Sequence, residues 1–264
     1  MFEKSIRSDY EAERMAIKGI LIVGATSGLG RGVAEHFIAS GWRVGVAGRN
    51  CTALGELVAL APDRVFSRRF DITAADAPDQ LETLAGTMGE VDIFLHCAGI
   101  LEEDPELPDE PMRRTVRTNV EGFTASLGWA FRHFRDTRRP GRIVAISSIA
   151  GYRGLGDIPA YSASKAYDQA FIEALRQKAD AMRLPVRFID IRPGWTRTPL
   201  LASDTHYLLE MSAADVLPKI IRAILRARRS ATIGLRWKLL TAVERILPAC
   251  IWERLHLPLW RNRH

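Results

Sequence analysis

Cysteine is scarce in this sequence, and its three copies, Cys51, Cys97 and Cys250, lie far apart without a CxxC pair. Their odd number and wide spacing argue against a disulfide framework and against a zinc site, so we expect no metal and a reducing compartment. The chain also lacks the run of about 18 apolar residues that a membrane-spanning helix needs. Residues 1–18 carry charges throughout, which disfavours a signal peptide and predicts a polar N-terminal arm. A cytoplasmic protein is the expectation.

Acidic residues are scarce at the C-terminal end of the chain. The net charge is +6, yet the segment from Lys219 onward holds eleven Lys and Arg residues against two acids, Glu244 and Glu253. The excess of basic charge therefore belongs to the tail rather than to the body of the protein. No recognised nucleic-acid module accompanies it, so we expect no nucleic-acid partner.

Short apolar, β-branched runs recur along the 264 residues, and each is followed by a helical pattern. Such alternation predicts a parallel sheet covered by helices on both faces, wound in both directions, with ligands beyond the carboxyl ends of its strands. We expect a single α/β domain of the Rossmann type over residues 19–235, followed by an amphipathic extension over 236–264. The sheet should have about seven strands, near residues 19–23, 43–47, 64–66, 91–95, 142–146, 186–191 and 230–235.

A glycine-rich turn, Gly24-Ala-Thr-Ser-Gly-Leu-Gly30, follows the first predicted strand and opens a helix. Glycines there let the backbone approach a pyrophosphate, and the helix N-terminus supplies amide donors. Glycine is common in tight turns, so the placement after the first strand carries the prediction.

The second strand ends in Gly48-Arg49-Asn50, without the acid that would accept hydrogen bonds from an adenosine ribose. An arginine can instead bind a 2′-phosphate, which favours NADP(H) over NAD(H). The alternative is that Arg49 is a solvated residue that begins a helix.

Ser148 follows the fifth predicted strand, and Tyr161 and Lys165 are spaced i, i+4, so their side chains share one face of a helix. Carbonyl reduction needs a proton donor to the oxygen, and alcohol oxidation needs a base. A lysine ammonium beside a tyrosine favours the phenolate, and a serine hydroxyl can hold the substrate oxygen. Each of these features is common by chance, and only their combination with the glycine loop indicates a hydride-transfer enzyme.

With these elements in this order, the chain resembles the short-chain dehydrogenase/reductase family, in its form of about 250 residues, over residues 19–235. The loop resembles TGxxxGxG, with Val23 in place of threonine, and His96-Cys-Ala-Gly99 stands where the family has NNAG. The family's lysine also contacts the nicotinamide ribose, and its NxxG asparagine, here Asn119, helps to hold a water that relays protons to the lysine.

The resemblance implies a set of site residues. Ser148, Tyr161, Lys165 and Asn119 would be catalytic. Nicotinamide dinucleotide would be bound by the loop, by the segments after the later strands and by two of the catalytic residues, namely Gly24, Thr26, Ser27, Gly28, Leu29, Gly30, Arg49, Asp71, Ile72, Ala98, Gly99, Tyr161, Lys165, Pro193, Gly194, Thr196 and Thr198. The implied activity is reversible hydride transfer between NADP(H) and a carbonyl or alcohol. A non-catalytic dinucleotide sensor is the alternative, but it would be expected to lose Tyr161 or Lys165.

The substrate side should be mostly apolar, built from Tyr152, Leu155, Trp195, Leu200 and Tyr207, and this predicts an apolar small-molecule substrate. Several of these side chains could instead pack under a short lid. The family commonly forms homodimers and homotetramers through two long helices, here 112–135 and 161–182, and the resemblance implies the same.

The extension places Leu239, Leu240, Val243, Ile246 and Leu247 at helical spacing, with Lys238, Thr241, Glu244 and Arg245 opposite. We favour packing of this apolar face on the body or on another subunit. A peripheral membrane contact, with a lipid-derived ketone as substrate, is the alternative.

Overall fold

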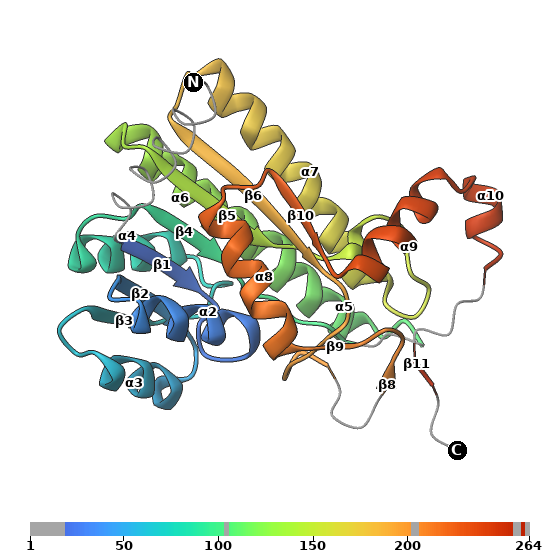
Figure 1. Ribbon diagram of the computed structural model, residues 1–264, viewed down its shortest axis with the longest axis horizontal. Helices are drawn as coiled ribbons and strands as arrows, with labels where there is room; N and C mark the ends of the chain where they lie inside the picture. Colours follow the sequence, from blue (N-terminus) through green and yellow to red (C-terminus); the bar gives the residue numbers. More distant parts are fainter. Residues whose placement is uncertain (1–18, 103–105, 202–205, 256–259, 262–264) are drawn as a thin grey trace, which may run out of the picture.

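The computed structural model describes residues 19–102, 106–201, 206–255 and 260–261. The predicted N-terminal arm, residues 1–18, lies outside this range. In the described residues a seven-stranded parallel sheet, in the order β10-β6-β5-β4-β1-β2-β3, forms the centre of the molecule (Figure 1). Its strands are β1 (Gly19–Val23), β2 (Arg43–Gly48), β3 (Val65–Arg69), β4 (Ile93–His96), β5 (Gly141–Ile146), β6 (Val186–Pro193) and β10 (Ser230–Ile233). The predicted α/β fold with a doubly wound sheet of about seven strands is confirmed.

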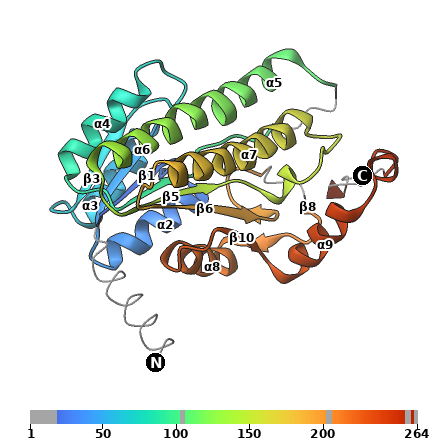
Figure 2. The ribbon, with the colours of Figure 1, turned by 90° about the horizontal axis from the view of Figure 1, so that it is seen from above.

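Helices cover both faces of the sheet (Figure 2). One face packs against α2 (Gly28–Ala39), α3 (Cys51–Leu60) and α8 (Ala213–Leu225). The other packs against α4 (Ala77–Met88), α6 (Phe123–Thr137) and α7 (Pro159–Ala181), with α5 (Asp109–Val116) leading into α6. Two apolar cores result, one on each side of the strands.

The central strand β1 shows why these residues form a buried sheet. All five of its residues are buried, and Ile20 pairs with Val44 of β2 on one side and Ile93 of β4 on the other. Burial of each such side chain is worth about 1.5–3 kcal/mol relative to exposure. Because both faces of the strand are covered, its sequence is an unbroken apolar run rather than an alternating one.

The sheet positions a crevice where its strand order reverses. From β1 the chain winds outward through β2 and β3, then returns to β4 and winds the other way through β5, β6 and β10. In such sheets ligands bind beyond the carboxyl ends of the strands at this reversal. The glycine loop follows β1, and the residues after β4, β5 and β6 lie at the same edge.

The long helix predicted over 112–135 is divided. It begins as α5, passes through a π-helical turn at Arg117–Gly122, and continues as α6. Such turns are rare and occur often at functional sites, because the extra residue rotates the side chains that follow. Asn119 lies in this turn and is buried.

Short elements complete the carboxyl edge. The turn η2 (Ile149–Gly151) follows β5, β7 (Thr196–Arg197) pairs with β9 (Met211–Ser212), and β8 (His206–Tyr207) pairs with β11 (Trp260–Arg261). After β10 the chain forms α9 (Leu235–Ile246) and α10 (Ala249–Trp252), which we call the roof. Both figures place the roof at the carboxyl end of the sheet.

Candidate active site

In the glycine loop after β1, backbone atoms pack closely against each other and against the segment after β4. A Cβ on Gly30 would lie 2.0 Å from the Gly24 carbonyl oxygen, and one on Gly24 would lie 2.5 Å from the Ala98 nitrogen. Gly28 has a φ of +52°, a left-handed conformation that favours glycine. The loop borders a groove of about 390 Å³. Gly28 and Leu29, in the first turn of α2, line this groove, and no side chain caps the helix there, so the residues present fit a dinucleotide pyrophosphate.

The groove gathers most of the residues predicted to bind the cofactor. Those that line it are Gly24, Thr26, Ser27, Gly28, Leu29, Arg49, Asp71, Ile72, Ala98, Gly99, Tyr161, Lys165 and Thr198. Gly30 does not line the groove, but its lack of a side chain lets the loop fold back against the Gly24 carbonyl. Pro193, Gly194 and Thr196 line a second cavity beside the groove, described below.

One end of the groove is basic. Arg49 is 70% exposed, and its guanidinium lies 3.7 Å from the Asp71 carboxylate. Arg69, at the end of β3, donates a hydrogen bond of 3.2 Å to the Arg49 carbonyl. The Asp71 carboxylate is held by Thr73, whose amide and hydroxyl donate to it at 2.9 and 2.8 Å. This end therefore offers an exposed arginine to an anion, with a second arginine against its backbone.

Tyr161 and Lys165 come from the first turns of α7 and share one face, as their spacing predicts. Both are buried, with exposures of 5% and 4%, and the ammonium lies 5.8 Å from the centre of the tyrosine ring. Ser148 lies at the start of η2, where its hydroxyl oxygen accepts a hydrogen bond from the Ala150 amide at 3.1 Å. That contact leaves the hydroxyl hydrogen available to a substrate oxygen. These three of the four predicted catalytic side chains therefore meet beside the groove.

Lys165 has an ionic partner that the sequence reading missed. Its ammonium lies 2.9 Å from the Asp168 carboxylate, one turn further along α7, and Asp168 is fully buried. Burial lowers the pKa of Lys165, but Asp168 together with Tyr161 and Cys97 outweighs this effect, so the net pKa lies above the ordinary value. Burial likewise raises the pKa of Asp168 to about 6, against the attraction of Lys165. Lysine and aspartate thus form a buried ion pair behind the tyrosine.

The pKa of Tyr161 does not fall, although a neighbouring lysine is expected to lower it. Lys165 and the Ser148 hydroxyl both lower the pKa of Tyr161, as predicted, but burial has a larger effect and the net pKa is raised. Asp168 adds to the rise, because its negative charge opposes a phenolate. At neutral pH the tyrosine therefore carries its proton and can donate it.

Asn119 fastens the segment after β4. Its amide oxygen accepts from the Ile100 nitrogen at 2.9 Å, and its amide nitrogen donates to the Ile100 carbonyl at 2.8 Å and to the Ser164 hydroxyl at 3.1 Å. A Cβ on Gly99 would lie 3.3 Å from the Asn119 oxygen and 3.7 Å from the Lys165 ammonium. Asn119, Gly99 and Lys165 therefore meet at one point, where a side chain on residue 99 would crowd the ammonium.

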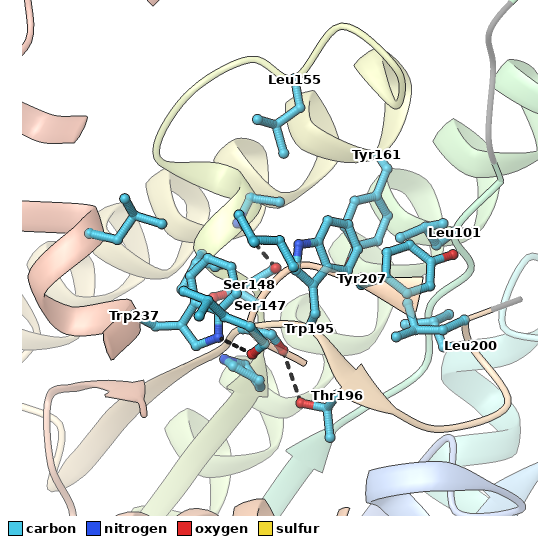
Figure 3. A pocket seen from close by; sticks show the side chains of 18 of the residues that line it. Leu101, Ser147, Ser148, Leu155, Tyr161, Trp195, Thr196, Leu200, Tyr207 and Trp237 are labelled. Atoms are coloured by element: carbon cyan, nitrogen blue, oxygen red, sulfur yellow. Dashed lines mark hydrogen bonds between the residues drawn. The ribbon is translucent and has the colours of Figure 1, made fainter. Parts of the chain in front are cut away.

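A larger cavity, the pocket, lies beside the groove (Figure 3). It has a volume of about 550 Å³, and Leu29, Leu101, Ile146, Ser147, Tyr161, Thr198 and Leu200 line both cavities. Of the predicted substrate residues, Leu155, Trp195, Leu200 and Tyr207 line the pocket, and the rings of Trp195 and Tyr207 stack with centres 4.8 Å apart. Tyr161 therefore stands in a wall common to the groove beside the glycine loop and a mostly apolar pocket.

Residues 18–207 match the sequence profile of the short chain dehydrogenases. The chain belongs to this family. A curated relative, an uncharacterized oxidoreductase of Myxococcus xanthus, is 33% identical over 248 residues, which cover 90% of this chain and 96% of the relative. The family resemblance drawn from the motifs is thereby confirmed.

Solved structures share the fold of this short-chain dehydrogenase. A short-chain dehydrogenase from Streptomyces avermitilis is 22% identical with a TM-score of 0.71, covering 87% of this chain and 93% of the other. ElxO, solved with NADP bound, is 20% identical with a TM-score of 0.70, covering 84% and 99%. Serine dehydrogenase from Escherichia coli is 27% identical with a TM-score of 0.61, covering 67% and 82%.

The structure places one predicted substrate residue of this short-chain dehydrogenase elsewhere. Tyr152 is absent from the pocket lining among the described residues, because its ring packs against Arg192 at 4.8 Å and Arg245 at 5.7 Å. Its hydroxyl pairs with the Thr232 hydroxyl at 3.1 Å. Tyr152 therefore joins the end of β6 to the roof.

The roof supplies lining residues that the sequence reading missed, namely Trp237, Leu240, Glu244 and Trp252. Arg153, which also lines the pocket, donates to the Glu244 carbonyl at 3.0 Å and to the Leu247 carbonyl. The Trp252 indole donates to the Gly154 carbonyl at 2.9 Å. A Cβ on Gly194 would lie 2.1 Å from the Trp237 indole nitrogen, so only glycine admits the roof this close. The extension of this short-chain dehydrogenase is therefore part of its pocket.

The structure corrects the predicted orientation of α9. Leu239, Val243 and Ile246 do not pack on the body, since they are 65%, 51% and 79% exposed. Thr241 and Glu244, predicted on the outer polar face, turn inward, Thr241 being buried and Glu244 facing the pocket. Trp237 determines this rotation, because its large ring is buried against Gly194 and its indole donates to the Leu209 carbonyl at 3.2 Å.

Proposed function

We propose that this protein is an NADPH-dependent carbonyl reductase that also runs in reverse as an alcohol dehydrogenase, with an apolar substrate. The observation that carries the proposal is the place of Tyr161, in the wall shared by the groove and the pocket. A nicotinamide cofactor in the groove would supply the hydride, and a substrate in the pocket would bring its carbonyl to the tyrosine.

The protein's own groups would handle the proton and the developing charge. Ser148 and Tyr161 would donate hydrogen bonds to the carbonyl oxygen, and Tyr161 would transfer its proton as that oxygen becomes negative. Its raised pKa suits a donor, since the proton is present at neutral pH. The buried Lys165 ammonium would then stabilise the phenolate left behind, and Asn119 would hold the lysine end of the groove in place.

The preference for NADP(H) is supported by charge. The groove ends at Arg49, which is largely exposed and only loosely paired with Asp71 at 3.7 Å. A 2′-phosphate would gain a charge-assisted contact there, whereas NADH would gain nothing from the arginine. The loop between β2 and α3 carries no carboxylate to accept hydrogen bonds from a free ribose.

The apolar substrate is supported by the lining of the pocket. Leucine and aromatic side chains form most of the wall, and the charged groups, Arg153 and Glu244, lie on the roof side. Burial raises the pKa of Glu244, and Arg153 opposes that rise. A ketone or aldehyde with a sizeable apolar body fits this distribution of polar groups.

We further propose a homodimer or homotetramer, assembled through α5–α6 and α7, in a reducing cytoplasmic compartment. Val116 of α5 is 42% exposed, which leaves an apolar side chain on that surface. No helix in the described parts of the chain is long and apolar enough to cross a membrane. Light scattering of the purified protein measures the assembly directly.

The proposed function is tested by Tyr161→Phe. Loss of the hydroxyl removes the proton donor, so kcat for carbonyl reduction should fall by at least roughly a thousandfold, while NADPH binding followed by fluorescence stays within about threefold. Tyr167→Phe is the matched control, because Tyr167 lies on the same helix and its hydroxyl pairs with the Thr124 hydroxyl at 2.7 Å. Retained turnover in Tyr161→Phe would exclude the tyrosine as the proton donor.

A further inference from the structure

The outer surface of α9 carries an apolar stripe, formed by Leu235, Leu239, Val243 and Ile246. These side chains are 74%, 65%, 51% and 79% exposed. Spacings of four, four and three residues place all of them along one side of the helix. Isolated exposed leucines are ordinary on soluble proteins, but four in a row on one helix mark a contact surface.

The opposite side of the same helix faces the pocket. Trp237, Leu240 and Glu244 line the cavity, and they lie about half a helical turn from the stripe. One short helix therefore separates the pocket from the stripe. Two other exposed leucines, Leu200 and Leu208, line the cavity itself and are 39% and 57% exposed. Beyond α9, Ile251 and Leu255 are 47% and 44% exposed.

Basic residues flank the stripe on both sides. Arg236 lies along one side of α9, and Lys238 and Arg245 lie along the other. None of the three forms an ion pair with any residue in the ranges that the structure describes. An apolar stripe with basic residues on both sides matches an anionic bilayer, where apolar side chains enter the acyl region and long basic ones reach the phosphates.

We propose that the outer face of α9 docks this protein on an anionic membrane surface, and that the pocket beneath receives a lipid-derived carbonyl compound from that surface. The substrate half of this inference rests on the proposed carbonyl reductase activity; the docking half does not. Docking at the stripe places the pocket one helix away from the bilayer, so an apolar substrate has a short path to Tyr161.

The charges favour a bilayer over a second copy of the chain. In a symmetric pair of stripes, Arg236, Lys238 and Arg245 of both copies would meet, and like charges facing each other oppose association. The helix itself is short, so two stripes would cover far less than the 1,200–2,000 Å² or so of a stable interface. A lipid surface provides both the apolar phase and the opposite charge.

Docking is tested by flotation of the full-length protein with two kinds of vesicle, one of phosphatidylcholine alone and one of mixed phosphatidylcholine and phosphatidylglycerol. Wild type should float with the mixed vesicles and much less with the neutral ones. Leu239→Glu/Val243→Glu places two carboxylates in the stripe and should lower the apparent affinity by roughly tenfold or more. Both side chains are exposed, so the fold should be kept. Leu60→Glu, a matched control at a 56% exposed leucine of α3, should float like wild type.

Two flotation results and one light-scattering result would overturn docking. Wild type that stays with the soluble fraction does so, and so does a double variant that floats equally well. If instead light scattering shows an assembly that the double variant breaks, the stripe is a subunit interface and not a membrane surface.

The substrate half is tested with a long-chain methyl ketone dissolved in the mixed vesicles and with a small water-soluble ketone. The double variant should reduce the water-soluble ketone like wild type but lose roughly tenfold in rate on the vesicle-borne one. Equal rates on the vesicle-borne ketone would overturn delivery from the membrane. If neither protein oxidises NADPH with any ketone, the proposed reductase activity fails, while flotation still decides the docking.

Discussion

Asp168 fixes the position of the Lys165 ammonium before any ligand binds. A carboxylate and an ammonium 2.9 Å apart, both buried, hold each other in one geometry and keep the ammonium behind Tyr161. The second carboxylate oxygen of Asp168 has no hydrogen-bond partner among the described residues. The pair therefore depends on Lys165 alone, and breaking it leaves an uncompensated buried charge that costs about 3–5 kcal/mol.

Asp168→Asn should move the pH profile of alcohol oxidation toward lower pH. Asp168 raises the pKa of Tyr161, and oxidation needs the deprotonated tyrosine. Removing the negative charge lowers that pKa, so the rising limb of kcat against pH should shift down by roughly one unit.

Asp180→Asn, at an exposed site on the same helix, serves as the control for Asp168→Asn. An unchanged limb in Asp168→Asn, with the protein folded by circular dichroism, would mean that Asp168 does not influence the titration of the tyrosine. In wild type the carboxyl has a pKa of about 6, so its own protonation should affect the profile only below that pH.

The roof is an element held by few contacts. Arg153 satisfies two carbonyls at the end of α9, those of Glu244 and Leu247, which have no partner of their own within the helix. The Trp252 indole adds one hydrogen bond to the Gly154 carbonyl. Since the outer face of α9 is exposed, these bonds and the burial of Trp237 carry most of its attachment to the body.

Arg153→Gln should loosen α9 while leaving the sheet intact. Loss of two charge-assisted hydrogen bonds removes roughly 2–4 kcal/mol of local stability. Amide hydrogen exchange in α9 should therefore speed up by at least tenfold, with exchange in α7 unchanged. Arg236→Gln is the control, since Arg236 is exposed on the same helix and its side chain forms no hydrogen bond or ion pair with the described residues. Equal protection of α9 in wild type and Arg153→Gln would mean that the Arg153 hydrogen bonds do not hold α9 in place.

Cofactor binding acts on the stability of the whole molecule. A ligand at a hundred times its Kd adds about 2.7 kcal/mol to the free energy of unfolding, which raises the Tm of a chain of this size by roughly 5–10 °C. NADPH should raise the Tm more than NADH at equal concentration, and Arg49→Ala should erase that difference.

Arg68→Ala controls for the loss of a positive charge near Arg49, because Arg68 instead binds Gln80 at 2.6 Å. Equal shifts with both cofactors in wild type would contradict the preference for NADP(H). They would leave the roles proposed for Ser148, Tyr161 and Lys165 untouched.

The parts of this molecule that sequence could predict are those that depend on local spacing. Residues 24–30 must turn at the end of a buried strand, and Tyr161 and Lys165 share a face wherever a helix forms. Asp168 lies only three residues from Lys165, but an acid on an amphipathic helix is usually solvated, so only the depth of α7 in the core reveals the pairing.

The orientation of α9 could not be predicted in the same way. Its apolar residues fall on more than one side of the helix. Leu239 and Leu240, for example, are the same residue type and differ only in where they lie around the helix. The rotation is determined by contacts distant in the chain, such as Trp237 against Gly194 and Arg153 with Glu244, 91 residues away. The periodicity of the sequence predicts the helix, but it does not predict which side of the helix packs against the body.

The two sides of α9 allow natural selection to act on them separately. A substitution at Leu240 or Glu244 alters what fits in the pocket and leaves the outer surface as it was. A substitution at Leu239 or Val243 alters what the surface meets and leaves the pocket as it was. Descendants of such a chain can therefore change substrate without changing where the protein docks, or change where it docks without changing substrate, while the seven strands and the glycine loop stay the same.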